Sequence, residues 1–377
     1  MTSASTTPAL FTPLALGSHR LANRIAIAPM CMYSADDGSA GDWHLHHWTS
    51  LGISGAAMVT IEATGVERRG RISHGCLGLY SEANEAAAAR ALAAARRFSP
   101  ATTLFGIQLC HAGRKASTQR PFEGGGPLGA HEDRWSVVGP SPIAFAPGYP
   151  VPEALDAPGI ERVIAAFVSA ARRAERAGFD FVELHGAHGY LLHEFLSPIS
   201  NRRDDRWGGS LDNRMRLILA VAEAVRAALS PRMFVGVRLS ASEWVEGGFS
   251  LDEAVEVARA LKAAGTVYIC ASSGGNVHDA KVPVGPLYQA HFAETIQREA
   301  AIPTRAVGLI TEPEQAEALI ASGRVDMIAV ARAVLADPRW PWRAAAALGG
   351  PLPRVPQYDR SLATLRHWVE PKTQHAA

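Results

Sequence analysis

The sequence has little of what marks nucleic-acid-binding, membrane or disulfide-linked proteins. Its 37 Lys and Arg balance 36 Asp and Glu, so a formal charge of +1 offers no concentrated positive field. No stretch reaches the roughly 18 consecutive apolar residues of a spanning helix, and the N-terminal MTSASTTP lacks the basic and apolar regions of a signal peptide. Four scattered cysteines are too few for a disulfide framework. We therefore expect a cytoplasmic protein that binds neither nucleic acid nor membrane.

The composition indicates a folded chain, because 47% of its 377 residues are hydrophobic and a disordered chain could not bury so much apolar surface. Runs that are almost continuously apolar are typical of parallel strands covered on both faces. Eight short runs of this kind recur, at residues 24–30, 56–62, 104–110, 179–185, 233–239, 267–272, 304–309 and 326–331.

Amphipathic segments with helical periodicity lie between these runs, among them residues 82–98, 160–177, 214–229, 251–264 and 312–322. Gly178, Gly265 and Gly323 each follow such a segment, where glycine commonly ends a helix in the left-handed conformation. Ser250 and Glu253 form the pattern of a capping box at a helix start. Eight successive strand–helix units predict a closed (β/α)8 TIM barrel.

An open doubly wound sheet is the alternative α/β architecture. That sheet would carry a G-x-G-x-x-G turn after its first strand, whereas Met30 is followed by Cys-Met-Tyr-Ser. We therefore expect one barrel domain over residues 1–377, with its core at about 10–350.

Three segments lie outside the repeating pattern. Residues 14–21, with Gly17-Ser18 at the centre, predict an N-terminal hairpin that closes the bottom of the barrel. Residues 113–158 are rich in Gly and Pro, and so long a loop after the third strand is more often functional than structurally idle. Residues 351–377, with three prolines near their start, predict an extended C-terminal tail.

Active sites of such barrels lie at the C-terminal ends of the strands. Clustered polar groups there need buried partners or a ligand, so their concentration favours a polar cofactor. The strand ends carry thiol, phenol, amide, imidazole and guanidinium groups: Cys31, Tyr33, Gln108, His111, His185, His188, Tyr190, Arg238 and Arg332.

The ends of the seventh and eighth strands form the usual phosphate site of these barrels. Gly308 permits close approach of the backbone, and Arg332 can hold a phosphate with two hydrogen bonds. The alternative for Arg332 is a salt bridge to a loop carboxylate such as Asp337, and the position of the arginine favours phosphate.

His185 and His188, with Tyr190 close behind, form the densest cluster of titratable residues. Two imidazoles three residues apart can converge on one substrate oxygen while a phenol delivers a proton. They could instead ligate a metal, joined by His44, His46 or His47, or serve as hydrogen-bonded structural residues. The first interpretation is favoured, and the residues alone leave all three open.

The cysteines point to little chemistry by themselves. Cys31 could be a nucleophile, but no partnered base is evident and an inert role is favoured. Cys110 and Cys270 fall within strands, where packing is expected, and Cys76 has no assigned role.

Several motifs together resemble the Old Yellow Enzyme family of FMN-dependent ene-reductases, over about residues 10–360. The Pro-Met-Cys run, the tyrosine two residues later and Ala-Gly-Arg-Lys are similar to the thermophilic-like subclass, which includes bacterial NADPH dehydrogenases and xenobiotic reductases. The motifs are APMCMY at 28–33, FGIQLCHAGRK at 105–115, ELHGAHGYLLHEFLS at 183–197, SNRRD at 200–204, WGGSLDNR at 207–214 and AVG at 306–308.

This resemblance implies that the barrel binds FMN and that NADPH or NADH donates hydride to it. It places Cys31 near the flavin N5 edge, tuning its potential, and Arg238 beside N1 and O2, where a positive charge stabilises the reduced flavin. The other implied cofactor contacts are Ala28, Pro29, Met30, Ala63 and Gln108 at the ring and Gly308, Ala331 and Arg332 at the phosphate.

The resemblance also implies the reduction of an activated C=C bond in an enone or a nitro compound. His185 and His188 would bind the substrate oxygen, Tyr33 would touch the substrate, and Tyr190 would donate the proton. Arg360 would enter a neighbouring subunit's site in a homo-dimer or homo-tetramer.

Two departures and two alternatives accompany the resemblance. Ala331 stands where the family often has glycine, and the chain continues beyond Arg360 further than the subclass does. A metal-dependent hydrolase using His44, His46, His185 and His188, and a non-catalytic flavoprotein, are the alternatives to an ene-reductase.

Overall fold

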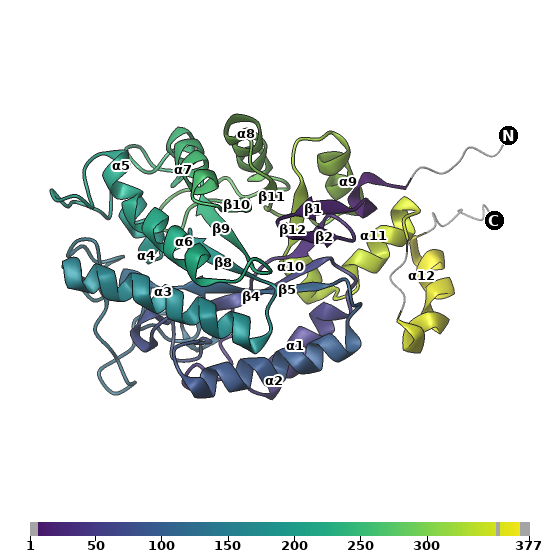
Figure 1. Cartoon of the computed structure of the whole chain (residues 1–377), viewed down its shortest axis with the longest axis horizontal. Helices are drawn as coiled ribbons and strands as arrows, with labels where there is room; N and C mark the ends of the chain where they lie inside the picture. The colour runs from purple at the N-terminus through teal and green to yellow at the C-terminus, as the bar shows by residue number, and fades with distance from the viewer. Residues whose placement is uncertain (1–6, 352–354, 370–377) are drawn as a thin grey trace, which may run out of the picture.

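Eight parallel strands close into a barrel in the computed structural model, which describes residues 7–351 and 355–369 (Figure 1). Closure is made by β12, which pairs with β3 through Ile328 and Ile25. Each strand overlaps one predicted apolar run, so the predicted (β/α)8 barrel is confirmed. In order around the barrel the strands are β3 (Ile25–Ile27), β4 (Met58–Gly65), β5 (Leu104–Cys110), β8 (Phe181–Gly186), β9 (Phe234–Ser240), β10 (Tyr268–Ser272), β11 (Thr304–Ala306) and β12 (Met327–Val330).

Helices surround the barrel and bury the outer faces of its strands (Figure 1). Within the described ranges, no helix combines the length and apolarity needed to cross a membrane. The helices are α1 (Asp42–Gly52), α2 (Glu82–Phe98), α3 (Ala157–Ala177), α4 (Leu191–Leu196), α5 (Leu211–Arg214), α6 (Arg216–Ala228), α7 (Leu251–Ala263), α8 (Ala290–Ala300), α9 (Pro313–Ala321), α10 (Arg332–Ala336), α11 (Trp340–Leu348) and α12 (Leu362–Val369).

Local signals in the sequence account for several helix ends. The Ser250 hydroxyl accepts from the Glu253 amide, and the Glu253 carboxylate accepts from the Ser250 amide, both at 3.3 Å, so the predicted capping box is present. Gly178 ends α3 with φ +96°, as predicted. Helix α3 begins earlier than predicted because the Asp156 side chain caps it, accepting from the Gly159 amide at 2.8 Å.

The predicted N-terminal hairpin is present as β1 (Leu14–Leu16) and β2 (His19–Leu21), with Gly17 at φ +58° in its turn. Leu16 and Leu21 join the apolar cluster that includes Phe181 and Phe234 of the barrel strands. Removal of these apolar surfaces from water holds the hairpin across the bottom of the barrel.

The long loop after β5 carries four short elements and folds over the rim. These are η3 (Gly113–Lys115), η4 (Pro121–Glu123), β6 (Val138–Gly139) and β7 (Glu153–Ala154). Its side chains Ala116 and Val137 pack beside Tyr190. The loop therefore helps to shape the surroundings of the predicted site.

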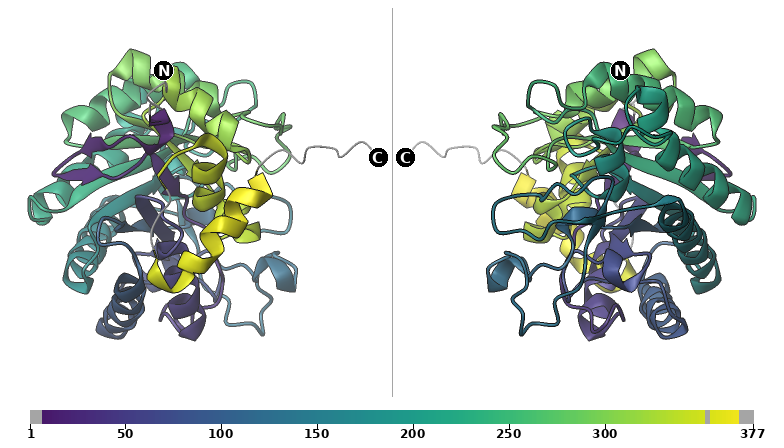
Figure 2. Two further views of the ribbon diagram at one scale, coloured as in Figure 1. Left: turned by 90° about the vertical axis from the view of Figure 1, so that its right-hand side faces the viewer. Right: turned by 90° about the vertical axis from the view of Figure 1, so that its left-hand side faces the viewer.

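The prediction of an extended C-terminal tail is wrong for the described part of that segment. Residues 356–369 form the 3-10 helix η5 (Pro356–Ser361) and then α12, which lies beside α11 on one side of the barrel (Figure 2). The Tyr358 ring packs against Trp342 at 6.0 Å, and the Arg339 guanidinium lies 5.2 Å from the Tyr358 ring centre. The prolines were weighted above the helix-forming run that follows them, and packing on α11 stabilises that run.

A charged layer fills the inside of the barrel. Arg305 on β11 forms an ion pair with Glu183 on β8, and both side chains are fully buried. The Glu183 carboxylate also accepts from the Tyr268 hydroxyl at 2.6 Å and from the Gln108 side-chain amide at 2.8 Å. The carboxylate thus neutralises Arg305 and fixes the orientation of Gln108.

Candidate active site

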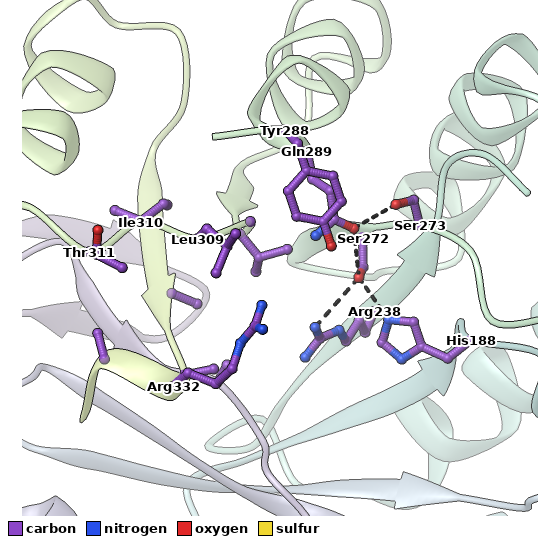
Figure 3. A pocket seen from close by; sticks show the side chains of 16 residues that line it. His188, Arg238, Ser272, Ser273, Tyr288, Gln289, Leu309, Ile310, Thr311 and Arg332 are labelled. Atoms are coloured by element: carbon purple, nitrogen blue, oxygen red, sulfur yellow. Dashed lines mark hydrogen bonds between the residues drawn. The ribbon is translucent and has the colours of Figure 1, made fainter. Parts of the chain in front are cut away.

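A pocket of about 310 Å³ opens at the C-terminal ends of the strands (Figure 3). It brings together six of the residues singled out in the sequence: Ala28, His188, Arg238, Gly308, Ala331 and Arg332. Other side chains of the lining, including Ser272, Ser273, Tyr288 and Gln289, were not assigned roles from the sequence. The strand-end rule located this face correctly.

Two guanidinium groups turn toward this pocket, those of Arg238 and Arg332 (Figure 3). No carboxylate in the described ranges forms an ion pair with either of them. The Arg238 Nε atom is buried without a hydrogen-bond partner, and its Nη2 lies 3.5 Å from the Ser272 hydroxyl. Asp337, the alternative partner of Arg332, instead accepts from Arg343 Nε at 3.1 Å. The pocket therefore presents positive charge that an anionic ligand can neutralise.

The pocket wall also contains two residues with positive backbone φ angles, Gly308 and Leu309. Gly308 has φ +117°, and a Cβ atom there would lie 2.9 Å from the Gln289 backbone nitrogen, so a larger residue is excluded. The next residue, Leu309, has φ +53°, a strained conformation of the kind that gathers at functional sites. Ala331 has φ −122°, outside the left-handed region, so this position does not need glycine.

His185, near the end of β8, and His188, just after it, have ring centres 5.1 Å apart, and the Tyr190 ring centre is 4.8 Å from that of His185. His188 has φ +59°, which turns the chain sharply at this point. Burial lowers the pKa of both imidazoles well below 6.5, and the charge of nearby Arg238 lowers it further. Both rings are therefore neutral at pH 7.

Hydrogen bonds indicate where the neutral rings carry their protons. The Ala187 backbone amide donates to His185 Nδ1 at 3.3 Å, which places the ring proton of His185 on Nε2. His188 Nε2 lies 2.7 Å from the Ser272 hydroxyl, which itself donates to the Gln289 side-chain oxygen at 3.2 Å. His188 Nε2 is thus the donor to Ser272, and Nδ1 of His188 is left for a ligand.

Tyr190 and Lys115 form a second part of the cluster. Burial raises the pKa of the Tyr190 phenol well above 10, so the phenol keeps its proton. The Lys115 ammonium lies 5.2 Å from the Tyr190 ring centre and donates to the carbonyl oxygens of His188, at 2.9 Å, and Gly275, at 2.7 Å. Burial lowers the pKa of Lys115 to about 8. The Ala-Gly-Arg-Lys motif contains this lysine, but its place beside Tyr190 depends on the long loop.

The remaining predicted ring contacts lie next to the pocket. Ala63 and Gln108 are register partners in β4 and β5, and both are buried. Pro29 and Met30 are half-buried directly after Ala28. Tyr33, the predicted substrate contact, has φ +54°. The flavin contacts of the ring residues and the substrate contact of Tyr33 stay predictions.

Cys31 is half-buried. The neighbouring Cys76 thiol and burial raise the pKa of Cys31 well above its usual value. The resting state of Cys31 is therefore a protonated thiol, which fits the favoured interpretation that it is not a free nucleophile.

The structure does not assemble the ligands of the metal-dependent hydrolase. No three His, Cys, Asp or Glu side chains in residues 7–351 and 355–369 are placed to hold a metal ion. His44 lies on α1, where its Nδ1 accepts from the Gly41 amide at 3.0 Å and its Nε2 lies 3.6 Å from the Glu62 carboxylate. His46 is exposed on the same helix, so the spacing that suggested ligands reflects helix packing instead.

Arg360 is exposed on η5 and does not reach the pocket of its own chain. Residues 355–358 share a groove with Ile53 and Phe98, at the C-terminal ends of α1 and α2. Those helix ends lead into the starts of β4 and β5, so the groove lies at the end of the barrel opposite the pocket. A role for Arg360 in a neighbouring subunit stays a prediction.

Comparison with known proteins assigns the barrel to a family. Residues 9–349 match the NADH:flavin oxidoreductase / NADH oxidase family. The chain belongs to this family. NADPH dehydrogenases of Geobacillus sp. (strain WCH70) and Listeria monocytogenes serovar 1/2a are 41% and 40% identical over 353 and 354 residues, 93% of this chain and 98% of each relative.

Solved structures agree with this family assignment. Morphinone reductase superposes with a TM-score of 0.75 at 27% identity, over 93% of this chain and 92% of that chain. A 2-naphthoyl-CoA reductase superposes with a TM-score of 0.78 over 91% of this chain, but this chain spans only 52% of its length and 24% identity shows the fold alone. The resemblance to the Old Yellow Enzyme family is confirmed. The protein is a flavin oxidoreductase that uses FMN and a nicotinamide cofactor.

Proposed function

We propose that this oxidoreductase reduces the activated C=C bond of α,β-unsaturated carbonyl compounds, and of nitro compounds that present an equivalent oxygen. The observation that carries the proposal is the cluster of two neutral imidazoles, His185 and His188, beside the protonated phenol of Tyr190. Such a cluster offers a hydrogen bond from His185 to a substrate oxygen and a proton from Tyr190 for the neighbouring carbon.

The pocket fits FMN on grounds of charge and space. The unpartnered Nε of Arg238 supports a contact with the electron-rich edge of the ring, and the guanidinium of Arg332, which lines the pocket together with Gly308, supports a phosphate site. When bound, FMN would supply the chemistry of hydride transfer between a nicotinamide cofactor and the alkene.

The protein residues supply polarisation and protonation. His185 Nε2–H donates to the substrate oxygen and stabilises the negative charge that develops there. A neutral imidazole suits this role because its N–H group is a fixed hydrogen-bond donor that keeps its proton during the reaction. Tyr190 gives its proton to the α-carbon, and the positive charge of Lys115 beside its ring stabilises the phenolate that remains.

Tyr190→Phe tests the assignment. In the variant, FMN binding and anaerobic reduction of the flavin by NADPH should be unchanged, while reduction of 2-cyclohexenone should fall about 10²- to 10⁴-fold. Tyr358→Phe, which removes an exposed phenol at the far end of the barrel, is the control and should leave both half-reactions unchanged. Equal loss of both half-reactions in Tyr190→Phe, or wild-type protein that binds FMN but reduces no enone or nitroalkene, would contradict the proposal.

A further inference from the structure

The turn that joins β8 to α4 has two successive residues in the left-handed region of the backbone. His188 has φ +59° and Gly189 has φ +73°. A left-handed conformation is unfavourable for a residue with a side chain, so it persists only where the surrounding structure holds it. The turn carries His188 and, directly after Gly189, Tyr190. The orientation of both residues therefore depends on contacts from other parts of the chain.

Three side chains hold this turn through its backbone. The Ser240 hydroxyl accepts from the His188 amide at 3.0 Å, and the Lys115 ammonium donates to the His188 carbonyl oxygen at 2.9 Å. His193, on α4, accepts from the Gly189 amide through its Nδ1 atom at 2.9 Å. His193 therefore fixes the peptide group directly before Tyr190.

The contact with Gly189 requires one protonation state of His193. The side chain is fully buried, and burial lowers its pKa to about 4, although the nearby Glu243 carboxylate opposes this effect. The ring is therefore neutral at pH 7 and carries one proton. Because Nδ1 accepts from the Gly189 amide, that proton is on Nε2.

The Glu243 carboxylate faces the protonated nitrogen of His193. Its Oε1 atom lies 3.3 Å from His193 Nε2, and both side chains are fully buried. The contact is electrostatic, since the two groups are not aligned as in a hydrogen bond. The Asn276 side-chain amide donates to Oε1 at 2.6 Å, and the Ser197 hydroxyl and the Phe249 backbone amide donate to Oε2 at 2.8 and 2.9 Å. A carboxylate fixed in this way selects the tautomer of the imidazole beside it.

We propose that His193 is a positioning residue for the proton-transfer step. Its Nδ1 atom fixes the Gly189 amide and thereby the orientation of Tyr190, while Glu243 holds the ring in the required tautomer. The inference rests on the proposed role of Tyr190 as the proton donor. His185 lies within β8 and outside the turn, so its hydrogen bond to the substrate oxygen does not depend on His193.

Two amide variants separate the two nitrogen contacts of His193. The side-chain oxygen in His193→Asn can take the place of Nδ1, whereas the amide in His193→Gln takes the place of Nε2. Reoxidation of the reduced flavin by saturating 2-cyclohexenone should stay within about threefold of wild type in His193→Asn. It should fall about 10- to 100-fold in His193→Gln, because a displacement of about 1 Å can lower a rate about 100-fold. Reduction of the flavin by NADPH needs no proton from Tyr190 and should change less than about threefold in both variants.

Two further readouts distinguish positioning from general damage to the site. In His193→Gln, the enone concentration that gives half the maximal rate of reoxidation should change less than about threefold, because His185 still binds the oxygen. The solvent deuterium isotope effect on reoxidation should increase, because proton transfer from Tyr190 has become slower. His46→Gln, at an exposed histidine on α1, is the control and should match wild type. Equal losses of rate in His193→Asn and His193→Gln, or an unchanged isotope effect in His193→Gln, would overturn the proposal.

Hydrogen exchange in the FMN-loaded wild-type protein tests the contact with Gly189 without any variant. The Gly189 amide should exchange slowly at pH 7, and exchange should be at least about tenfold faster in His193→Gln but not in His193→Asn. Exchange of this amide in wild type as fast as in an exposed loop would also overturn the proposal. The exchange measurement needs no enone. A wild-type protein that reduces no enone would contradict the proposed function, whereas a wild-type protein that reduces enones but has a rapidly exchanging Gly189 amide would contradict only the role of His193.

Discussion

Arg305 and Arg238 both project from strands of one barrel, yet their charges are balanced in opposite ways. Arg305 is fully buried, is paired with Glu183, and donates to the Thr60 hydroxyl at 3.2 Å. Arg238 forms no ion pair in the described structure, and this is the difference, because the Nε atoms of both arginines are buried without a hydrogen-bond partner. An unpaired buried charge is unfavourable. The carboxylate of Glu183 thus neutralises Arg305 inside the barrel, whereas the positive charge of Arg238 at the rim is left for a ligand to neutralise.

Glu183→Gln tests the neutralised side of this comparison and should have the largest effect. It leaves the charge of Arg305 without a carboxylate in the interior, which typically costs about 3–5 kcal/mol. The free energy of unfolding, measured with urea on the FMN-free protein, should fall by that amount. Adding Arg305→Met should recover most of the loss. A loss below about 1 kcal/mol would show that the interior tolerates the unpaired charge.

Arg238→Met tests the rim arginine, whose charge no carboxylate of the described residues neutralises. A hydrogen bond to a charged group contributes about 1.5–3 kcal/mol, so the Kd for FMN should rise about 10- to 150-fold. The FMN-free protein should keep its stability, because Arg238 has no ion pair to lose and only a long hydrogen bond, at 3.5 Å, to the Ser272 hydroxyl. Arg20→Met, an exposed arginine on β2, is the control and should change neither quantity. If the variant instead lowered the free energy of unfolding and left the Kd for FMN unchanged, Arg238 would serve the stability of the barrel and not the binding of a ligand.

The difference between these arginines was only partly predictable from the sequence. Arg238 and Arg332 fall at strand ends, where the barrel rule places ligand contacts. Arg305 sits inside an apolar strand, and its partner Glu183 lies 122 residues away, so nothing local reveals the pair. Likewise, Gln289 reaches Ser272 from before α8.

The fold was more predictable than the site because strands and caps are local signals. Continuous apolar runs located all eight barrel strands, and Ser250 with Glu253 located the start of α7. Helix α1 was missed because its aromatic and histidine residues, from Trp43 to Trp48, suggested metal ligation. The short α5 was also missed: the predicted helix over 214–229 is divided at Met215. Tertiary packing decides whether such a segment is helical and where a helix is interrupted.

The positive charge of Arg238 also lowers the pKa of the neighbouring His185 and His188. The variant His185→Asn tests this effect. The pKa of His185 in the folded state is lowered, first by burial and then by Arg238. The unfolded state therefore binds more protons below pH 6.5, and stability falls as the pH drops through that value. Asn at this position cannot titrate, so it should remove this part of the fall in stability between pH 7.5 and pH 5.0. Unfolding free energies at pH 7.5 and pH 5.0 measure it, with exposed His131→Asn as the control.

Asp337→Asn gives the smallest expected effect and tests whether Arg332 is free. Because Asp337 pairs with the partly exposed Arg343, its loss should lower the unfolding free energy by at most about 1 kcal/mol. The Kd for FMN should change less than about twofold, since no interaction with Arg332 is lost. A tenfold gain in FMN affinity would show that Asp337 competes for Arg332. In that case the rim would be neutralised from within, as the interior is by Glu183, and only Arg238 would remain charged for a ligand.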